Sequence, residues 1–283
     1  MQEIVTLPAT SGRGGQPSTV HAIHLRAPLM TLDAFDVPSD ARWVIDRWCE
    51  SPLPGLMIIS GPAPGRAFEQ AAVALYDHAR AVARSGAHRV HLAPNPEHGD
   101  AALLDALLDR VRRGREKVVV PIPALSAEAS LYRKFDGERK LPSEVLFGPN
   151  VFTAVLHVKT LPALCPVCAS VNPEAHAGDG IGARLASDFV SRLGIHERKG
   201  VRYIGGGCTS CQQVGTSGIA TLIEAHGVIE QSIFPTGDEN GGARWMEDLP
   251  GNMRGIARST MQGQLEDHVS AGRVDPHEAI RFL

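Results

Sequence analysis

Four of the five cysteines stand in two Cys-x-x-Cys pairs, "CPVC" (165–168) and "CTSC" (208–211), which are separated by 39 residues. Each pair can form a tight turn that points two thiolates at one ion, and two such turns complete a tetrahedral zinc site. Buried free thiols and redox-active pairs are the alternatives, but paired spacing of this kind favours a metal. Four protein ligands leave no open position for a substrate, so the zinc would be structural. The predicted ligands are Cys165, Cys168, Cys208 and Cys211.

A second stretch, "GLMIISGPAPGRAF" (55–68), has the outline of a phosphate-binding loop: an apolar run, a turn rich in Gly and Pro, and then a helix-like segment. A working loop of this kind also needs a Lys for the phosphates and a hydroxyl for Mg²⁺. Arg66 and Ala67 stand near those two positions, and Pro64 removes a backbone N–H donor. Any remaining contacts to nucleotide are therefore expected from Gly61, Gly65 and Arg66, where a cation and a helix N-terminus coincide.

The first half of the chain alternates short apolar runs with amphipathic stretches, which predicts a mostly parallel α/β sheet. After a Gly- and Pro-rich lead-in, the expected strands are 19–27, 55–60, 88–93 and 117–122. The expected helices are 39–50, with Ser39 as N-cap, the segment from Phe68 to Ala79, and 101–113. Cys49 lies on the first of these helices and is predicted to pack in the core.

From about residue 136 the pattern changes. A strand is expected at 151–158, a helix at 180–195 between the two cysteine pairs, and a short apolar segment at 219–230. Two helices are expected at the end of the chain. Met261, Leu265 and Val269 are spaced by four and Gly272 follows as a stop, while Asp275 and Pro276 are the N-cap and first residue of the last helix.

Composition restricts the class of protein. The 283 residues are 43% hydrophobic and 21% charged, as in ordinary soluble globular proteins. The net charge of −3 and the 5% aromatic content argue against nucleic acid as a partner. The first 19 residues contain no apolar core of signal-peptide length, and no run approaches about 18 apolar residues. We therefore expect a cytoplasmic protein, in which grouped cysteines indicate metal rather than disulfides.

Four segments together resemble the C-terminal motor domain of the type II secretion and type IV pilus assembly ATPases, the traffic ATPase family. In chain order they are "GLMIISGP", the CPVC pair, "GCTSCQQVGTSGIATLIE" and "LEDHVSAGRVDPHEAI". In that family a strand reading GLILVTGP leads into the loop, and a tetracysteine zinc module follows. The resemblance covers about residues 20–283 and is most specific in the zinc module. The matching positions are Gly207, Cys208, Cys211, Gly215, Gly218 and Glu224 in the module, and Leu265, Asp267, Gly272 and Glu278 in the tail.

The departures from the family pattern concern its catalytic groups. The family's GPTGSGKTT corresponds to "GPAPGRAF" (61–68), its EDPxE stretch to "PNPEH" (94–98), and its Walker B region to "KVVVPIPALS" (117–126). The family's histidine box is not recognisable, and we interpret His157 as a core or strand-end histidine instead. Losing the Lys, the hydroxyl, the catalytic carboxylate and the histidine box together would remove what phosphoryl transfer depends on.

The resemblance implies a RecA-like, P-loop-NTPase-type α/β core with a zinc-binding insertion and a helical C-terminal subdomain. The expected divisions are a lead-in (1–25), the degenerate core (26–160), the zinc module (161–232) and the helical subdomain (233–283). Pilus or secretion assembly proteins, including an active homologous ATPase, are the partners it implies. A homo- or hetero-hexamer and indirect attachment to the inner membrane through those partners are further expectations.

Three functional hypotheses follow. The favoured one is a non-catalytic scaffold or regulator, a pseudo-ATPase with structural zinc, for which ATP and Mg²⁺ are not expected as cofactors. The second is a divergent nucleotide-binding protein or weak ATPase that uses Gly61, Gly65 and Arg66. The third is a zinc-ribbon protein that binds nucleic acid, against which the net charge already argues.

Overall fold

The computed structural model describes most of the chain from Thr31 onward. The described residues are 31–63, 67–83, 89–97, 100–114, 116–131, 133–134, 140–146, 151–172, 180–193, 195, 199–228 and 257–281. The strand predicted at 19–27 lies outside them, and so do Gly65 and Arg66 of the loop-like turn.

One six-stranded sheet forms the centre of the molecule, in the order β2-β3-β1-β4-β5-β6. The first four strands of this order are parallel to one another, β5 runs antiparallel to β4, and β6 runs antiparallel to β5. This confirms the predicted α/β class with a mostly parallel sheet. The strands are β1 (Gly55–Gly61), β2 (Arg89–Leu92), β3 (Glu116–Pro123), β4 (Phe152–Leu164), β5 (Thr216–Val228) and β6 (Ala257–Ser259).

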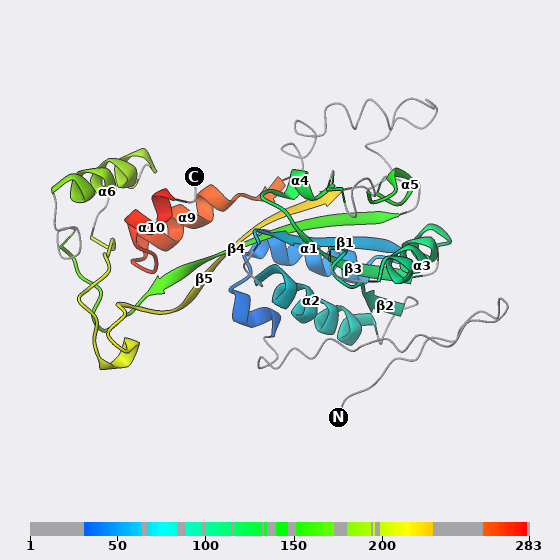
Figure 1. The fold of residues 1–283 in the computed structure, drawn as a ribbon, viewed down its shortest axis with the longest axis horizontal. Coiled ribbons are helices and arrows are strands. Elements are labelled where there is room, and N and C mark those ends of the chain that lie inside the picture. The colour runs from blue at the N-terminus through cyan, green and yellow to red at the C-terminus, as the bar shows by residue number, and fades with distance from the viewer. Residues whose placement is uncertain are drawn as a thin grey trace.

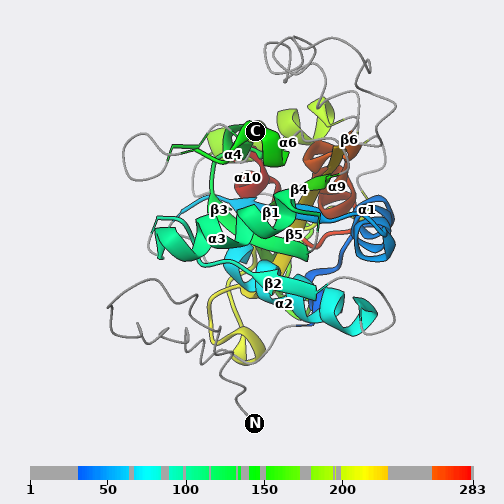
Figure 2. The ribbon, with the colours of Figure 1, turned by 90° about the vertical axis from the view of Figure 1, so that its right-hand side faces the viewer.

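Helices cover both faces of the sheet. Apolar side chains of β1 point to both faces, and every residue of β1 is buried by the helices that pack there. On one face a short 3₁₀ turn, η1 (Leu32–Phe35), packs with α1 (Ser39–Glu50) and α2 (Ala67–Ala83). On the other face lie α3 (Ala101–Arg112), α4 (Ala127–Leu131) and α5 (Ser143–Leu146). In Figure 2, α2 lies below the strands and α4 above them.

The helix α1 buries the predicted apolar positions, but its cap differs from the prediction. The helix begins at Ser39, so Pro38 occupies the N-cap position and no side chain caps this end. Proline fixes the backbone angle φ just before the first turn, and Ser39 is the first residue inside the helix.

Two strands are longer than the sequence indicated. β4 continues through Pro162 to Leu164, and residues 219–228 of the predicted apolar segment belong to a strand of equal length, β5. Residues 229 and 230 of that segment lie outside the described residues. The two pair with each other along nearly their whole length, from Thr153 and Val228 to Leu164 and Thr216. In Figure 1 they extend together away from the other strands, toward α6 and α10.

A separate hydrophobic cluster surrounds the outer half of this pair. It joins β4 and β5 to α6 (Gly180–Arg192), α9 (Met261–Ser270) and α10 (Pro276–Ile280). The predicted end of α9 is confirmed, since Gly272 has a φ of +65°, and so is the cap of α10, where Asp275 accepts from the N–H of His277 at 2.7 Å. The second oxygen of Asp275 accepts from the N–H of Ile204 at 2.5 Å, which fixes α10 to the segment before the second cysteine pair.

None of the helices in the described part of the chain is both long and apolar enough to cross a bilayer.

Candidate metal centre and the turn after β1

The four predicted ligands meet at the outer end of β4 and β5. Their sulfur atoms all lie within 4.8 Å of one another. The Sγ atoms of Cys165 and Cys208 are 3.8 Å apart, those of Cys168 and Cys211 3.7 Å, and those of Cys208 and Cys211 3.8 Å. A tetrahedral zinc with Zn–S bonds of about 2.3 Å requires S···S edges of about 3.8 Å. The cluster can therefore bind one metal ion, and its dimensions are compatible with zinc.

Glycines make both turns around the cluster possible. A Cβ on Gly205 would lie 1.8 Å from the carbonyl oxygen of Cys168, so the two cysteine turns can approach only where a side chain is missing. Gly207 has a φ of +87°, and a Cβ there would meet the backbone of Gln213 at 2.5 Å. The backbone freedom of these glycines is what allows the second turn to bend back on itself.

Backbone donors prepare one thiol for the anionic form. The N–H groups of Cys208 and Gly215 each lie 3.2 Å from the Sγ of Cys211 and donate to it. Burial works against ionisation of this thiol, but these two backbone hydrogen bonds, together with those from the thiols of Cys168 and Cys208, lower the pKa of Cys211 to about 6. A thiolate at neutral pH is the form that binds metal.

The turn after β1 requires glycine at Gly61. A Cβ at this position would lie 2.6 Å from the carbonyl oxygen of Val158 and 2.9 Å from the Cβ of Phe68, so only glycine fits. Gly65 and Arg66, the other residues predicted to contact nucleotide, lie outside the described residues. A cavity of about 180 Å³ adjoins the turn. Its lining is Pro62, Ala63, Ala67, Phe68, Val158, Lys159 and Thr160.

The strand next to this turn ends without a carboxylate. In the parallel register of β1 and β3, Pro121 and Pro123 lie beside Ile59 and Gly61, and the N–H of Ala124 donates to the carbonyl of Gly61 at 2.8 Å.

The carboxylates that follow β2 and begin α2 have partners of their own. Glu97 accepts from the Nε of Arg133 at 3.1 Å, and Glu69 accepts from the amide of Asn95 at 3.0 Å. Glu97 is thus held in an ion pair.

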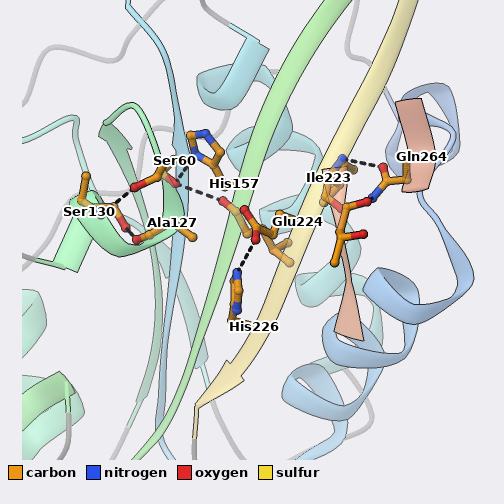
Figure 3. A network of polar contacts seen from close by, with 12 residues as sticks. Ser60, Ala127, Ser130, His157, Ile223, Glu224, His226 and Gln264 are labelled. Carbon is orange, nitrogen blue, oxygen red and sulfur yellow. Dashed lines mark hydrogen bonds and ion pairs between the residues drawn. The ribbon is translucent and has the colours of Figure 1, made fainter. Parts of the chain in front are cut away.

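A buried polar network crosses β1, β4 and β5 on the face opposite α2 (Figure 3). The hydroxyl of Ser60 lies 2.9 Å from Nδ1 of His157, which is only 1% exposed. Burial, with a contribution from Lys159, lowers the pKa of His157 to about 4, so the imidazole is neutral at pH 7. His157 is a core histidine, as predicted.

The network continues onto β5, where Glu224 lies opposite His157 in the ladder. Its carboxylate contacts Nε2 of His226 at 3.2 Å, and the hydrogen bond from this imidazole lowers the pKa of Glu224. No role was predicted for Ser60 or His226. Their positions could have indicated a role. Ser60 is the one polar side chain of β1, and His226 stands two residues after Glu224 and so on the same side of β5.

A buried lysine was also missed. Lys117 on β3 is 1% exposed, and its ammonium donates to the carbonyls of Trp48, Cys49 and Ser51 at 2.5, 2.9 and 2.7 Å. Burial lowers its pKa to about 8. The lysine thus satisfies the free carbonyls at the end of α1. The thiol of Cys49 is buried there, and burial raises its pKa to about 12, so it packs as predicted and is inert.

No family model matches the sequence, and no curated protein matches it. Among solved structures, the fold is similar to the X-ray structure of the Legionella pneumophila ATPase DotB, with a TM-score of 0.50 and 11% sequence identity. The match covers 89% of this chain and 65% of the DotB chain, so the chain spans less than two thirds of that protein. At this identity the likeness concerns the fold alone: the α/β core of this chain is arranged like that of DotB.

Proposed function

We propose that this protein is a non-catalytic scaffold or regulator related to the type II secretion and type IV pilus assembly ATPases, with a structural zinc ion in its cysteine cluster. One observation carries the proposal. At the edge of the sheet where such a fold holds nucleotide, β1 leads into Gly61-Pro62-Ala63 and the adjacent strand ends in Pro121-Ile122-Pro123.

The argument is electrostatic. Phosphoryl transfer depends on positioning and on stabilising charge, for which the loop needs a Lys, a hydroxyl that holds Mg²⁺ and a nearby carboxylate. Ala67 begins α2 where the hydroxyl would stand, and the nearest end of β3 offers only aliphatic and proline side chains. The adjoining cavity of about 180 Å³ is also smaller than the roughly 300–1,000 Å³ of typical ligand sites.

The zinc part of the proposal is supported by the spacing of the four sulfur atoms and by the two N–H donors to Cys211. When bound, zinc would hold the ends of β4 and β5 in one place. With all four positions taken by cysteines it would not take part in a reaction.

The partners belong to the same proposal. A protein that keeps the fold of an assembly ATPase without its chemistry acts by binding. Its partners would be pilus or secretion assembly proteins, including an active homologous ATPase in a shared hexameric ring. Through them it would be placed at the cytoplasmic side of the inner membrane.

A titration with ATP and Mg²⁺ tests the central point. Purified, zinc-loaded protein would be titrated by calorimetry, and its melting temperature followed in parallel. A ligand at about 100 times its Kd stabilises a fold by ~2.7 kcal/mol, which such a melt detects. We expect no binding at millimolar ATP and the same result for Arg66→Ala. Binding that disappears in Arg66→Ala would instead establish a nucleotide sensor, and turnover proportional to protein concentration would refute the proposal.

A further inference from the structure

Among the described residues, one edge of β4 has no strand partner beyond the end of β1. β4 pairs with β1 only as far as His157, but it continues to Leu164. Its other edge is covered by β5 throughout. On the open side, the N–H of Leu164 donates to the carbonyl of Arg273 at 2.8 Å, which closes the far end. Between these two points, no strand in the described ranges pairs with this edge.

The direction of the backbone groups shows what the edge offers. The N–H of Phe152 bonds to the segment just before β1, and the carbonyl of Val158 lies 2.6 Å from the Cβ position of Gly61. Even-numbered residues of β4 therefore direct their backbone groups toward this side. Thr160 presents both its N–H and its C=O there. Pro162 presents only a C=O, and proline without a ladder N–H is typical of an edge strand.

The cavity beside the turn opens along the same edge. Val158, Lys159 and Thr160 form one wall, and four residues from the turn and the start of α2 form the other. Those four are Pro62, Ala63, Ala67 and Phe68. Thr160 is half-buried and Pro162 exposed, so a chain can approach. Among the described lining residues only Lys159 is charged, and most of the others are apolar, so this lining suits an aliphatic side chain.

The geometry points to a peptide-binding edge: an extended segment of a partner protein adds to β4 beside Val158–Pro162 and inserts one aliphatic side chain into the cavity. Strand addition uses this combination, in which backbone hydrogen bonds give affinity and a pocket for an alternate side chain gives specificity. The added segment would continue the line of β1 past Gly61. The inference goes beyond the proposed function, because it does not depend on whether the turn after β1 binds ATP.

The probe is a set of acetylated, amidated heptapeptides with random flanks and a fixed central residue, Val, Leu, Phe, Asp or Lys, whose binding to the full chain is read by fluorescence anisotropy. We expect peptides with a central Val or Leu to bind at least tenfold more tightly than those with Asp or Lys. Methylating the backbone nitrogens of the best peptide, one at a time, should weaken binding at least tenfold at alternate positions only. Equal binding of all sets, or indifference to methylation at every position, would overturn the inference.

A matched pair of variants locates the site. Ala67→Leu fills the cavity and should weaken the best peptide at least tenfold, whereas Ala81→Leu, on the exposed side of the same helix, should leave it unchanged. Equal affinity of the two variants would place binding elsewhere. The methylation series uses the unaltered protein, so it decides the question even where Ala67→Leu does not fold. ATP binding, measured separately, bears on the proposed function alone.

Discussion

Acidification should destabilise the fold through His157. Its imidazole is buried at 1% exposure, and burial, with Lys159 and His226 acting in the same direction and Glu224 against them, lowers its pKa from 6.5 to about 4. The unfolded chain therefore takes up a proton at a higher pH than the folded chain does. Stability is fully present above pH 6.5 and falls as the pH drops from 6.5 toward 4, because protonation favours the unfolded state.

The size of the effect follows from the two pKa values. One pKa unit corresponds to 1.36 kcal/mol, so a separation of 6.5 from about 4 contributes at most about 3 kcal/mol. Between pH 7 and pH 5, where the folded imidazole is still mostly neutral, the loss is about 2 kcal/mol. The hydrogen bond from His226 also lowers the pKa of Glu224. That carboxylate titrates below its ordinary value of 4.5, which lies outside the interval from pH 7 to pH 5.

Urea unfolding at pH 7 and pH 5 measures this loss. In His157→Gln the pH dependence of the free energy of unfolding should be about 2 kcal/mol smaller than in the unaltered protein. Ser60→Ala is the matched control, because it removes the hydroxyl 2.9 Å from Nδ1 but keeps the titrating group, so its pH dependence should persist. Equal pH dependence in His157→Gln and the unaltered protein would mean that the buried imidazole is already charged, and the reasoning from burial would fail.

The features that the sequence predicted correctly are those with local causes. β1 reads as an uninterrupted apolar run and is buried at every residue. The Asp275-Pro276 start signal caps α10 as expected, because a cap depends on residues within one turn. The cysteine cluster was also predictable. Each turn is set by a spacing of three residues, and two such turns can share one metal ion only if they lie close together.

The features that were missed depend on contacts between distant segments. Lys159, Thr160 and Pro162 interrupt the apolar pattern of β4, and the strand persists there because β5 pairs with it. A lysine within the apolar run of β3 gives no indication that carbonyls 66 to 69 positions away need a donor. The role of Ser60 likewise appears only when β4 brings His157 beside it.

Three further perturbations test the structural roles assigned above. Lys117→Met should lower the free energy of unfolding by about 3 kcal/mol, since it leaves three carbonyls at the end of α1 without their donor. Urea unfolding should show almost no change for the exposed control Lys140→Met, and equal effects of the two substitutions would refute the role of Lys117 at the end of α1. Asp275→Ala removes both the cap of α10 and the acceptor for the N–H of Ile204, so urea unfolding should show a free energy of unfolding lower by about 2 kcal/mol. A decrease below about 0.5 kcal/mol would show that water replaces these hydrogen bonds. Elemental analysis of the unaltered protein should find one zinc per chain. Cys208→Ser should abolish this metal binding and lower the melting temperature, because metal binding supplies folding energy to the ends of β4 and β5. Cys49→Ala alters a buried thiol distant from the cluster in sequence and should keep its zinc, so equal zinc in Cys208→Ser and Cys49→Ala would refute the assignment of the cluster as the metal site.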